Sequence, residues 1–162
     1  MRALGLRAER DAVHWGLVSG TRDAPLLIDH SSLEPSKDFS EAEALSWIRA
    51  ESQTLLYELR PDRAIVWLPE LEPTRHLNAK MLANIAKRSR VEGVLLETCR
   101  SILARPDLLE VSHAACPEAK RSDFVAVDGV PVDWGEIKSM SRRQAIVAAA
   151  GLLKSNRELK SV

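Results

Sequence analysis

The first nineteen residues most constrain what this chain can fold into, because they predict two strands joined by a charged turn. Residues 2–8 alternate around Leu4 and Leu6, and residues 12–18 are rich in side chains that favour strands. Three charged residues, Glu9-Arg10-Asp11, lie between the two segments. The sequence therefore predicts a β-hairpin at the start of the fold.

The segments that follow predict a third strand, a helix and a buried strand. Residues 25–30 form a short apolar strand, and Ser40 and Glu43 have the S-x-x-E spacing of a helix capping box. Proline at position 61 ends that helix, because proline cannot continue the hydrogen-bond pattern. The nearly unbroken apolar run 62–68 is typical of a strand covered on both faces and reached through a helical crossover.

A second, longer helix is predicted over residues 75–103, with a bend near Gly93. Its expected buried seam contains Leu82, Ile85 and Ala86, which recur at helical spacing.

The remaining segments complete an α/β arrangement in one domain. Residues 108–113 predict a strand, 139–155 an alanine-rich helix, and 125–132 an edge segment at best, since Pro131 limits pairing. The predicted order is β-β-β-α-β-α-β-α, a three-stranded antiparallel meander followed by parallel strands with helical crossovers. We expect one domain over residues 1–156 and a frayed tail over 157–162.

Composition narrows the function classes. The chain has 162 residues with 23 basic and 23 acidic side chains, so it lacks the basic excess typical of a nucleic-acid-binding domain. No apolar run is long enough to cross a bilayer, and early arginines interrupt any signal peptide, so we expect a cytoplasmic protein without membrane association. Cys99 and Cys116 have no metal-ligand spacing, and no phosphate-loop, dinucleotide or nucleophile motif occurs. We expect no cofactor.

The pattern of segments resembles the RuvC-like Holliday-junction resolvase branch of the ribonuclease H-like superfamily. The segments that carry the resemblance are LGLRAERDAVHWGLV, RPDRAIVWLPE, NAKMLANIAKRSRVEGVLLETC, VSHAACPEAKRSDF and SRRQAIVAAAGLL. The chain is also similar to a group of small bacterial proteins with the same layout. The resemblance implies a ribonuclease H-like fold, and because such nucleases pair, it implies a homodimer.

The resemblance also implies where a nuclease would hold its metals. In these enzymes four carboxylates bind two divalent ions that activate water and stabilise the displacement at phosphorus. The matching positions here are Arg7, Trp67, Ser141 and Gln144, and none is acidic. Magnesium requires hard oxygen ligands, and an arginine at the centre of the site repels it. The resemblance therefore carries over the fold and argues against the activity, so no catalytic residue and no metal ligand is predicted.

Two alternatives account for the missing carboxylates. Ligands could have been relocated to Glu70 and Asp11, giving a divergent metal-dependent nuclease. Otherwise the charge has been inverted, so that Arg7, Arg142 and Arg143 grip a phosphate beside Trp67, which could stack a base. Against this second interpretation, Arg7 could form an ordinary salt bridge with Glu9 or Asp62.

A basic stripe on the long helix is a second candidate surface. Lys80, Lys87 and Arg90 fall on one face together with His76, and they could follow a phosphate backbone without reading sequence. We predict a resolvase-like protein without nuclease activity that binds nucleic acid or another protein. A purely structural interaction module is the remaining alternative.

Overall fold

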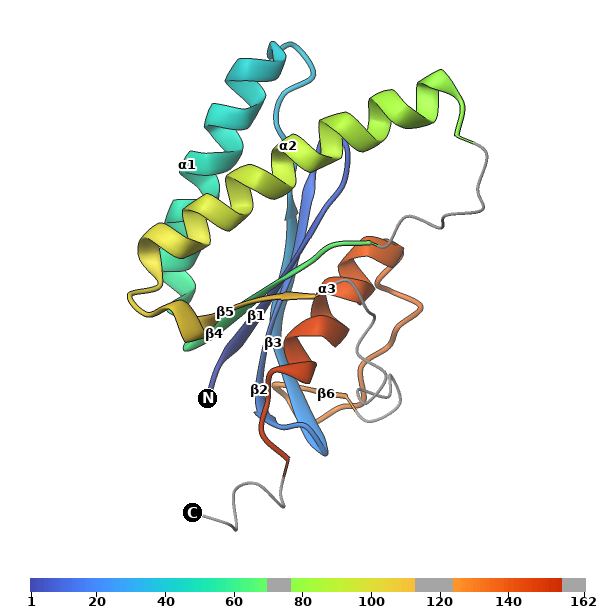
Figure 1. Cartoon of the computed structure of the whole chain (residues 1–162). Helices are drawn as coiled ribbons and strands as arrows, with labels where there is room; N and C mark the ends of the chain where they lie inside the picture. The colour runs from blue at the N-terminus through green and yellow to red at the C-terminus, as the bar shows by residue number, and fades with distance from the viewer. Residues whose placement is uncertain (70–76, 113–123, 156–162) are drawn as a thin grey trace.

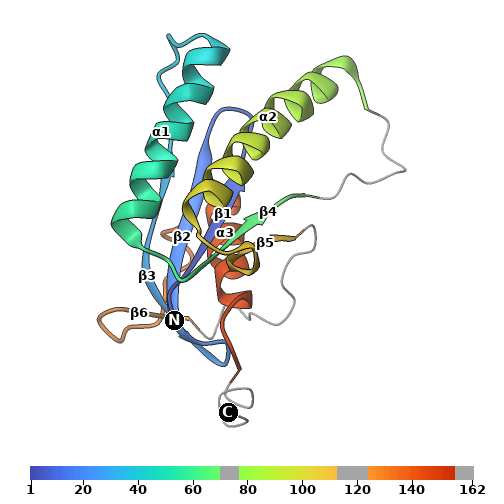
Figure 2. The same cartoon turned by 60° about the vertical axis from the view of Figure 1, so that its left-hand side comes forward.

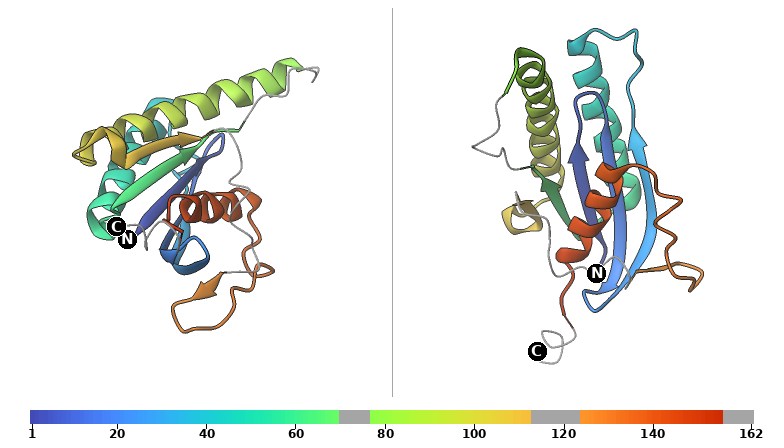
Figure 3. Two further views of the ribbon diagram at one scale, coloured as in Figure 1. Left: turned by 60° about the horizontal axis from the view of Figure 1, so that its bottom comes forward. Right: turned by 90° about the vertical axis from the view of Figure 1, so that its right-hand side faces the viewer.

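The computed structural model of the chain describes residues 1–69, 77–112 and 124–155. In this part of the chain, six strands form one mixed sheet in the order β5-β4-β1-β2-β3-β6. Helices α1 and α2 cover one face of the sheet, and α3 covers the other (Figure 1 and Figure 3). The elements are β1 (Ala3–Ala8), β2 (Val13–Thr21), β3 (Ala24–Leu33), α1 (Glu41–Leu59), β4 (Arg63–Trp67), α2 (Ala79–Ile102), the short 3-10 helix η1 (Pro106–Leu108), β5 (Leu109–Ser112), β6 (Val125–Ala126) and α3 (Met140–Gly151).

The opening hairpin is confirmed, and it lies at the centre of the sheet. β1 pairs antiparallel with β2 and parallel with β4, so the first strand has a neighbour on both sides. β3 pairs antiparallel with β2 and runs three residues beyond the predicted end at His30, to Leu33. The longer strand brings Ser32 opposite His14 on β2.

The alternation along β1 divides the core into two layers. Leu4 and Leu6 point toward α1 and α2, whereas Ala3 belongs to the apolar cluster under α3. Successive side chains of a strand point to opposite faces, so Gly5 and Arg7 share the α3 face with Ala3. Arg7 is therefore a charged residue near the end of a central strand, on the face that α3 covers.

The first helix begins as its capping box predicts. The Ser40 hydroxyl accepts a hydrogen bond from the Glu43 backbone N–H, and the Glu43 carboxylate accepts one from the Ser40 N–H. The helix ends at Leu59, and Arg60 follows in the left-handed conformation with φ of 45°. This end immediately precedes the predicted stop at Pro61.

The predicted apolar seam of the second helix is wrong. α2 is continuous through Gly93, but Leu82 is 52% exposed and Ala86 is also exposed. The buried positions lie in the second half of the helix, at Val91, Glu92, Leu95, Thr98 and Cys99. Figure 2 shows why: the first half of α2 extends beyond the sheet, so no core exists for Leu82 to enter.

The segment over residues 125–132, predicted as an edge at best, contributes the edge strand β6. Val125–Ala126 pairs in parallel with β3, and Val125 also forms an isolated bridge with Pro131. This sixth strand was absent from the predicted element order, because two residues of strand give no periodic signal. The predicted tail, 157–162, lies outside the described residues. Within the described residues, no helix combines the length and apolar character needed to cross a membrane.

Candidate nucleic-acid interface

Glycine on two neighbouring strands allows α3 to pack closely over the sheet. A Cβ at Gly5 would lie 1.9 Å from the Ala145 carbonyl oxygen, and a Cβ at Gly16 would lie 2.4 Å from Ile146 Cγ1. Small residues on the helix match this approach, since Ala145, Ala148 and Ala149 are fully or almost fully buried. Close packing of the helix backbone places the first turns of α3 beside the end of β1.

Arg7 contacts Trp67 and Gln144, two of the positions that the resemblance singled out. Its guanidinium carbon lies 4.4 Å from the centre of a Trp67 ring, within the range of a cation–π interaction. Its Nε donates a hydrogen bond to Gln144 Oε1 at 3.2 Å, and its Nη1 donates one to the Ala8 carbonyl at 3.0 Å. The side chain is therefore fixed by β4, β1 and α3 together.

Among the described residues, no carboxylate forms an ion pair with Arg7. Asp62, one of the expected salt-bridge partners, accepts a hydrogen bond from the Arg2 backbone instead. Burial, and after it the positive charge of Arg88, lowers the pKa of Arg7 to about 10, while Glu92 and Glu9 oppose this shift. The guanidinium stays charged at neutral pH, but its charge is incompletely compensated.

The other expected partner, Glu9, lies in the β1–β2 turn and is bound elsewhere. Its carboxylate accepts a hydrogen bond from the Ser141 hydroxyl, and its Oε2 lies 3.6 Å from His14 Nε2. Ser141 is in the first turn of α3, which carries no acidic residue of its own. Glu9 therefore supplies the anion that a helix N-terminus favours. Burial lowers the pKa of His14, although Glu9 opposes that shift.

The structure brings together the four positions that the resemblance singled out. Arg7 contacts Trp67 and Gln144, and Ser141 lies one helical turn before Gln144 on the same helix. The two arginines of that turn do not join them. Arg142 Nη2 donates to Ser32 Oγ on β3, and Arg143 Nε donates to the Ile137 carbonyl at 2.6 Å. The expected grouping of these arginines around Arg7 is therefore not found: Arg142 is bonded to β3, which β2 separates from β1, and Arg143 is bonded to the segment before α3.

Trp67 packs against Arg7 and has no accessible ring face on which a base could stack. Its side chain is buried with 8% exposure, and the guanidinium of Arg7 covers a ring. Stacking of a nucleobase needs an accessible aromatic face, so the predicted stacking role of Trp67 does not fit this geometry.

Sequence reasoning missed Arg88 as a neighbour of Arg7. Arg88 lies on α2, pairs with Glu92 at 3.0 Å and faces Arg7 across a hollow of about 290 Å³. The hollow is lined by Arg7, Ala8, Glu9, Arg10, Asp11, Asn84, Ile85 and Arg88. The position of Arg88 was not predictable, because the predicted seam of Leu82, Ile85 and Ala86 placed a different face of α2 against the sheet.

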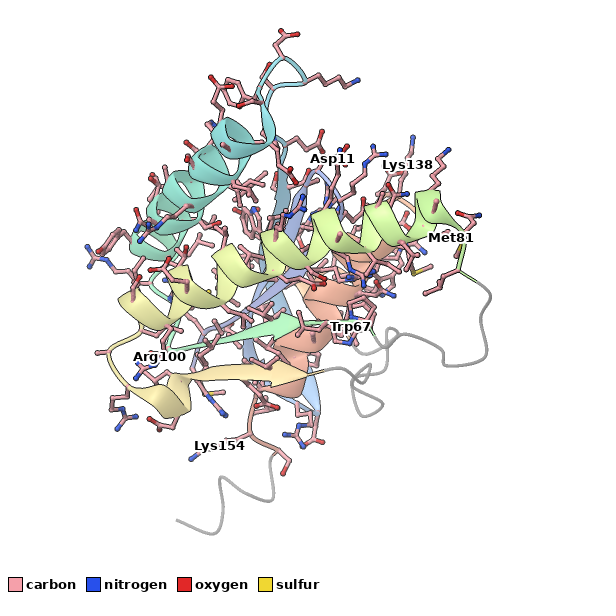
Figure 4. All side chains as sticks on the ribbon, turned by 45° about the horizontal axis from the view of Figure 1, so that its top comes forward. Asp11, Trp67, Met81, Arg100, Lys138 and Lys154 are labelled. Carbon is pink, nitrogen blue, oxygen red and sulfur yellow. The ribbon has the colours of Figure 1, made fainter. Side chains whose placement is uncertain are left out.

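The predicted basic stripe on α2 is only partly free. Arg90 forms an ion pair with Glu41 of α1, whereas Lys80 and Lys87 are exposed. His76 lies outside the described residues. In Figure 4, Asp11 and Trp67 lie toward the end of the sheet near the start of α2, and Arg100 lies toward the opposite end of α2.

Comparison with solved structures identifies the architecture. The chain is similar to Thermus thermophilus RuvC in complex with Holliday junction substrate, with a TM-score of 0.67, 13% identity, and 93% of this chain and 92% of that chain covered. A second Thermus thermophilus RuvC structure gives a TM-score of 0.63 at 13% identity, with 93% of this chain and 92% of that chain covered.

A yeast mitochondrial Holliday junction resolvase gives a TM-score of 0.63 at 10% identity, covering 98% of this chain and 80% of that one. The chain has the ribonuclease H-like fold of RuvC. No family model matches the sequence, and no curated protein does. The predicted fold class and the RuvC-like resemblance are confirmed at the level of architecture.

The residues at the RuvC-like site do not fit the divalent metal that the fold family implies. Arg7, Trp67, Ser141 and Gln144 offer a cation, an indole, a hydroxyl and an amide where a metal needs several carboxylates. Within the described residues, no group of three or more His, Cys, Asp or Glu side chains is placed to hold a metal ion. Asp11, one proposed relocated ligand, pairs with Arg10 at 2.6 Å, and Glu70 lies outside the described residues.

Proposed function

We propose that this protein binds the phosphate backbone of nucleic acid at Arg7 without a metal ion, and that it does not cleave it. The observation that carries the proposal is a half-buried guanidinium, fixed by Trp67 and Gln144, that has no ion-pair partner among the described residues. An anion in the adjoining hollow would compensate that charge. Phosphate suits this role, because arginine forms strong charge-assisted hydrogen bonds to its oxygens.

The fold supports nucleic acid as the source of that phosphate. One of the similar structures is a RuvC bound to a Holliday junction, and Arg7 stands where the resemblance puts a nuclease carboxylate. An arginine there would supply permanently the positive charge that metal ions supply in a nuclease, without activating water. Lys80 and Lys87, exposed on α2, would add sequence-independent contacts to neighbouring phosphates. A homodimer, expected from the resemblance, remains part of the proposal.

The test is fluorescence anisotropy with labelled single-stranded, duplex and four-way-junction DNA, across a salt series and with or without magnesium. We expect magnesium to leave binding unchanged or to weaken it by screening. Arg7→Gln should weaken binding roughly 10- to 100-fold, the range for a lost charge-assisted contact of about 1.5–3 kcal/mol. Arg100→Gln, which removes the same charge at the far end of α2, is the matched control and should change binding less than about twofold.

Three results would contradict the proposal. Equal weakening by Arg7→Gln and Arg100→Gln would show that only general charge attracts the DNA. Magnesium-dependent cleavage that disappears in Glu70→Gln would favour the divergent nuclease. Absence of binding at low salt would favour a protein-interaction module on the same fold.

A further inference from the structure

A second, larger hollow adjoins the one at Arg7. It has a volume of about 620 Å³ and shares the turn residues Glu9, Arg10 and Asp11 with the Arg7 hollow. We call it the Phe39 groove and define it by Phe39, Leu45, Ile48, Lys87 and Val91. The two hollows also share α2, since Arg88 lines one and its neighbour Lys87 lines the other.

The floor of the Phe39 groove is apolar, and the ring of Phe39 is accessible. Ile48 and Val91 are 1% and 3% exposed, so their side chains complete the core below the groove. Phe39, in the loop between β3 and α1, is 40% exposed. An accessible ring above buried aliphatic side chains is suited to packing against a flat apolar face.

The charges around the groove are of both signs. Lys37 and Lys87 contribute positive charge, while Glu34 and Glu41 contribute carboxylates. A phosphate would meet both attraction and repulsion here, whereas a neutral heterocycle could donate N–H groups to the carboxylates and accept from the lysines. The volume also falls within the roughly 300–1,000 Å³ typical of sites for small organic groups.

We infer that the Phe39 groove holds one unpaired nucleobase, stacked on Phe39. The inference rests on the proposed function, because the shared turn would let the strand whose backbone is bound at Arg7 place its next base in the groove. A base inside a duplex has both faces covered and its pairing edge occupied, so only an unstacked base could enter. The exposed ring of Phe39 provides the stacking surface that the buried Trp67 does not.

The first experiment compares an ordinary single strand with a strand of the same phosphate number that lacks its bases. Wild-type protein should bind the ordinary strand roughly 5- to 100-fold more tightly, the range expected for stacking of one base. Phe39→Ala should remove most of this preference, and Phe39→Tyr should retain it. Tyr57→Ala, which removes an aromatic ring that is 66% exposed and does not line the groove, should leave the preference unchanged.

The second experiment uses the free nucleoside of 2-aminopurine, whose fluorescence falls when it stacks. Quenching by wild-type protein and by Arg7→Gln, but not by Phe39→Ala, would support the groove independently of backbone binding. Matching melting temperatures for the Phe39 variants and wild type would exclude misfolding as the cause.

The outcomes separate the two proposals. Equal binding of both strands, sensitive to Arg7→Gln, would leave the backbone site standing and overturn the nucleobase site. Quenching that depends on Phe39, with no strand bound, would assign the groove to free nucleosides and overturn the backbone proposal. No quenching and no base preference would overturn the nucleobase site alone or, if neither strand binds, both proposals.

Discussion

α3 and α2 lie on opposite faces of one sheet but contact it in different ways. The backbone of α3 is in contact with the backbone of β1, since the Ala145 carbonyl occupies the space that a Cβ at Gly5 would need. At α2 a Cβ on Gly93 would meet nothing within 4 Å, and the helix extends beyond the sheet with Leu82 exposed. The candidate site lies between these two regions, with Arg7 held from the α3 side and Arg88 reaching it from the α2 side.

The comparison shows why one arginine makes a candidate site while others do not. Arg90 on α2 is half exposed and paired with Glu41, so solvent and a carboxylate already satisfy its charge. Arg7 is fixed by Trp67 and Gln144 in a partly buried place, and its charge has no ion-pair partner among the described residues. Burial and fixed geometry, more than the number of basic residues, distinguish the site.

The largest effect is expected from breaking the close contact on the α3 side. Gly5→Ala would place a methyl group against the Ala145 carbonyl oxygen. Because that oxygen belongs to the backbone, the clash can be relieved only by moving the helix. We expect a loss of about 3 kcal/mol or more in the free energy of unfolding, at the upper end for overpacked cores. Urea denaturation of the variant and of wild type measures this difference in the free energy of unfolding.

The matched control is Gly93→Ala on the α2 side. It should stabilise the protein by roughly 0.5–1 kcal/mol, because alanine favours a helix over glycine and the site has space. If Gly5→Ala unfolds at the same urea concentration as wild type, α3 does not approach β1 as closely as described.

A smaller effect of opposite sign is expected at Arg7. Burial lowers the pKa of Arg7 to about 10, well below its ordinary value, so the folded state disfavours the charged form and the cation costs stability at neutral pH. That cost is relieved only as pH rises above about 10. Arg7→Met should therefore raise the melting temperature, corresponding to about 0.5–1 kcal/mol, while abolishing Arg7-dependent DNA binding.

Arg90→Met is the corresponding change on the α2 side, and it should alter stability by less than about 1 kcal/mol, because the lost ion pair is exposed. A melting temperature that falls in Arg7→Met would show that the contacts with Trp67 and Gln144 outweigh the burial cost. The site would then have an ordinary structural role.

Much of the α3 region could be predicted from the sequence, and little of the α2 region could. Alternation on β1 placed Arg7 opposite its hydrophobic neighbours, and the order of elements put Trp67 on an adjacent strand and Gln144 on the last helix. These relations follow from strand periodicity and right-handed crossovers, which are general rules.

The packing of α2 could not be predicted from the periodicity of its sequence. Helical spacing fits more than one face of α2, and only tertiary packing decides that Val91 and Leu95, rather than Leu82 and Ala86, face the core. The partner of each charged side chain is also a tertiary property: Glu9 contacts Ser141 and His14 because the turn reaches the N-terminus of α3. The role of Arg88 therefore could not be predicted.

The smallest effect concerns two histidines on the α3 face, His14 and His30. Burial lowers the pKa of both, and the charge of Arg142 acts in the same direction, while Glu9 and Glu34 oppose it at His14 and Asp29 opposes it at His30. Below about pH 6.5 the unfolded chain therefore takes up protons more readily than the folded protein does. Stability that is present above that pH is lost as the pH falls further. His14→Gln should flatten the decline of melting temperature between neutral pH and mildly acidic pH, and His30→Gln should do so independently. A decline that becomes steeper in His14→Gln would contradict this prediction, because it would mean that Glu9 holds His14 protonated in the folded protein and that the Glu9–His14 contact is an ion pair.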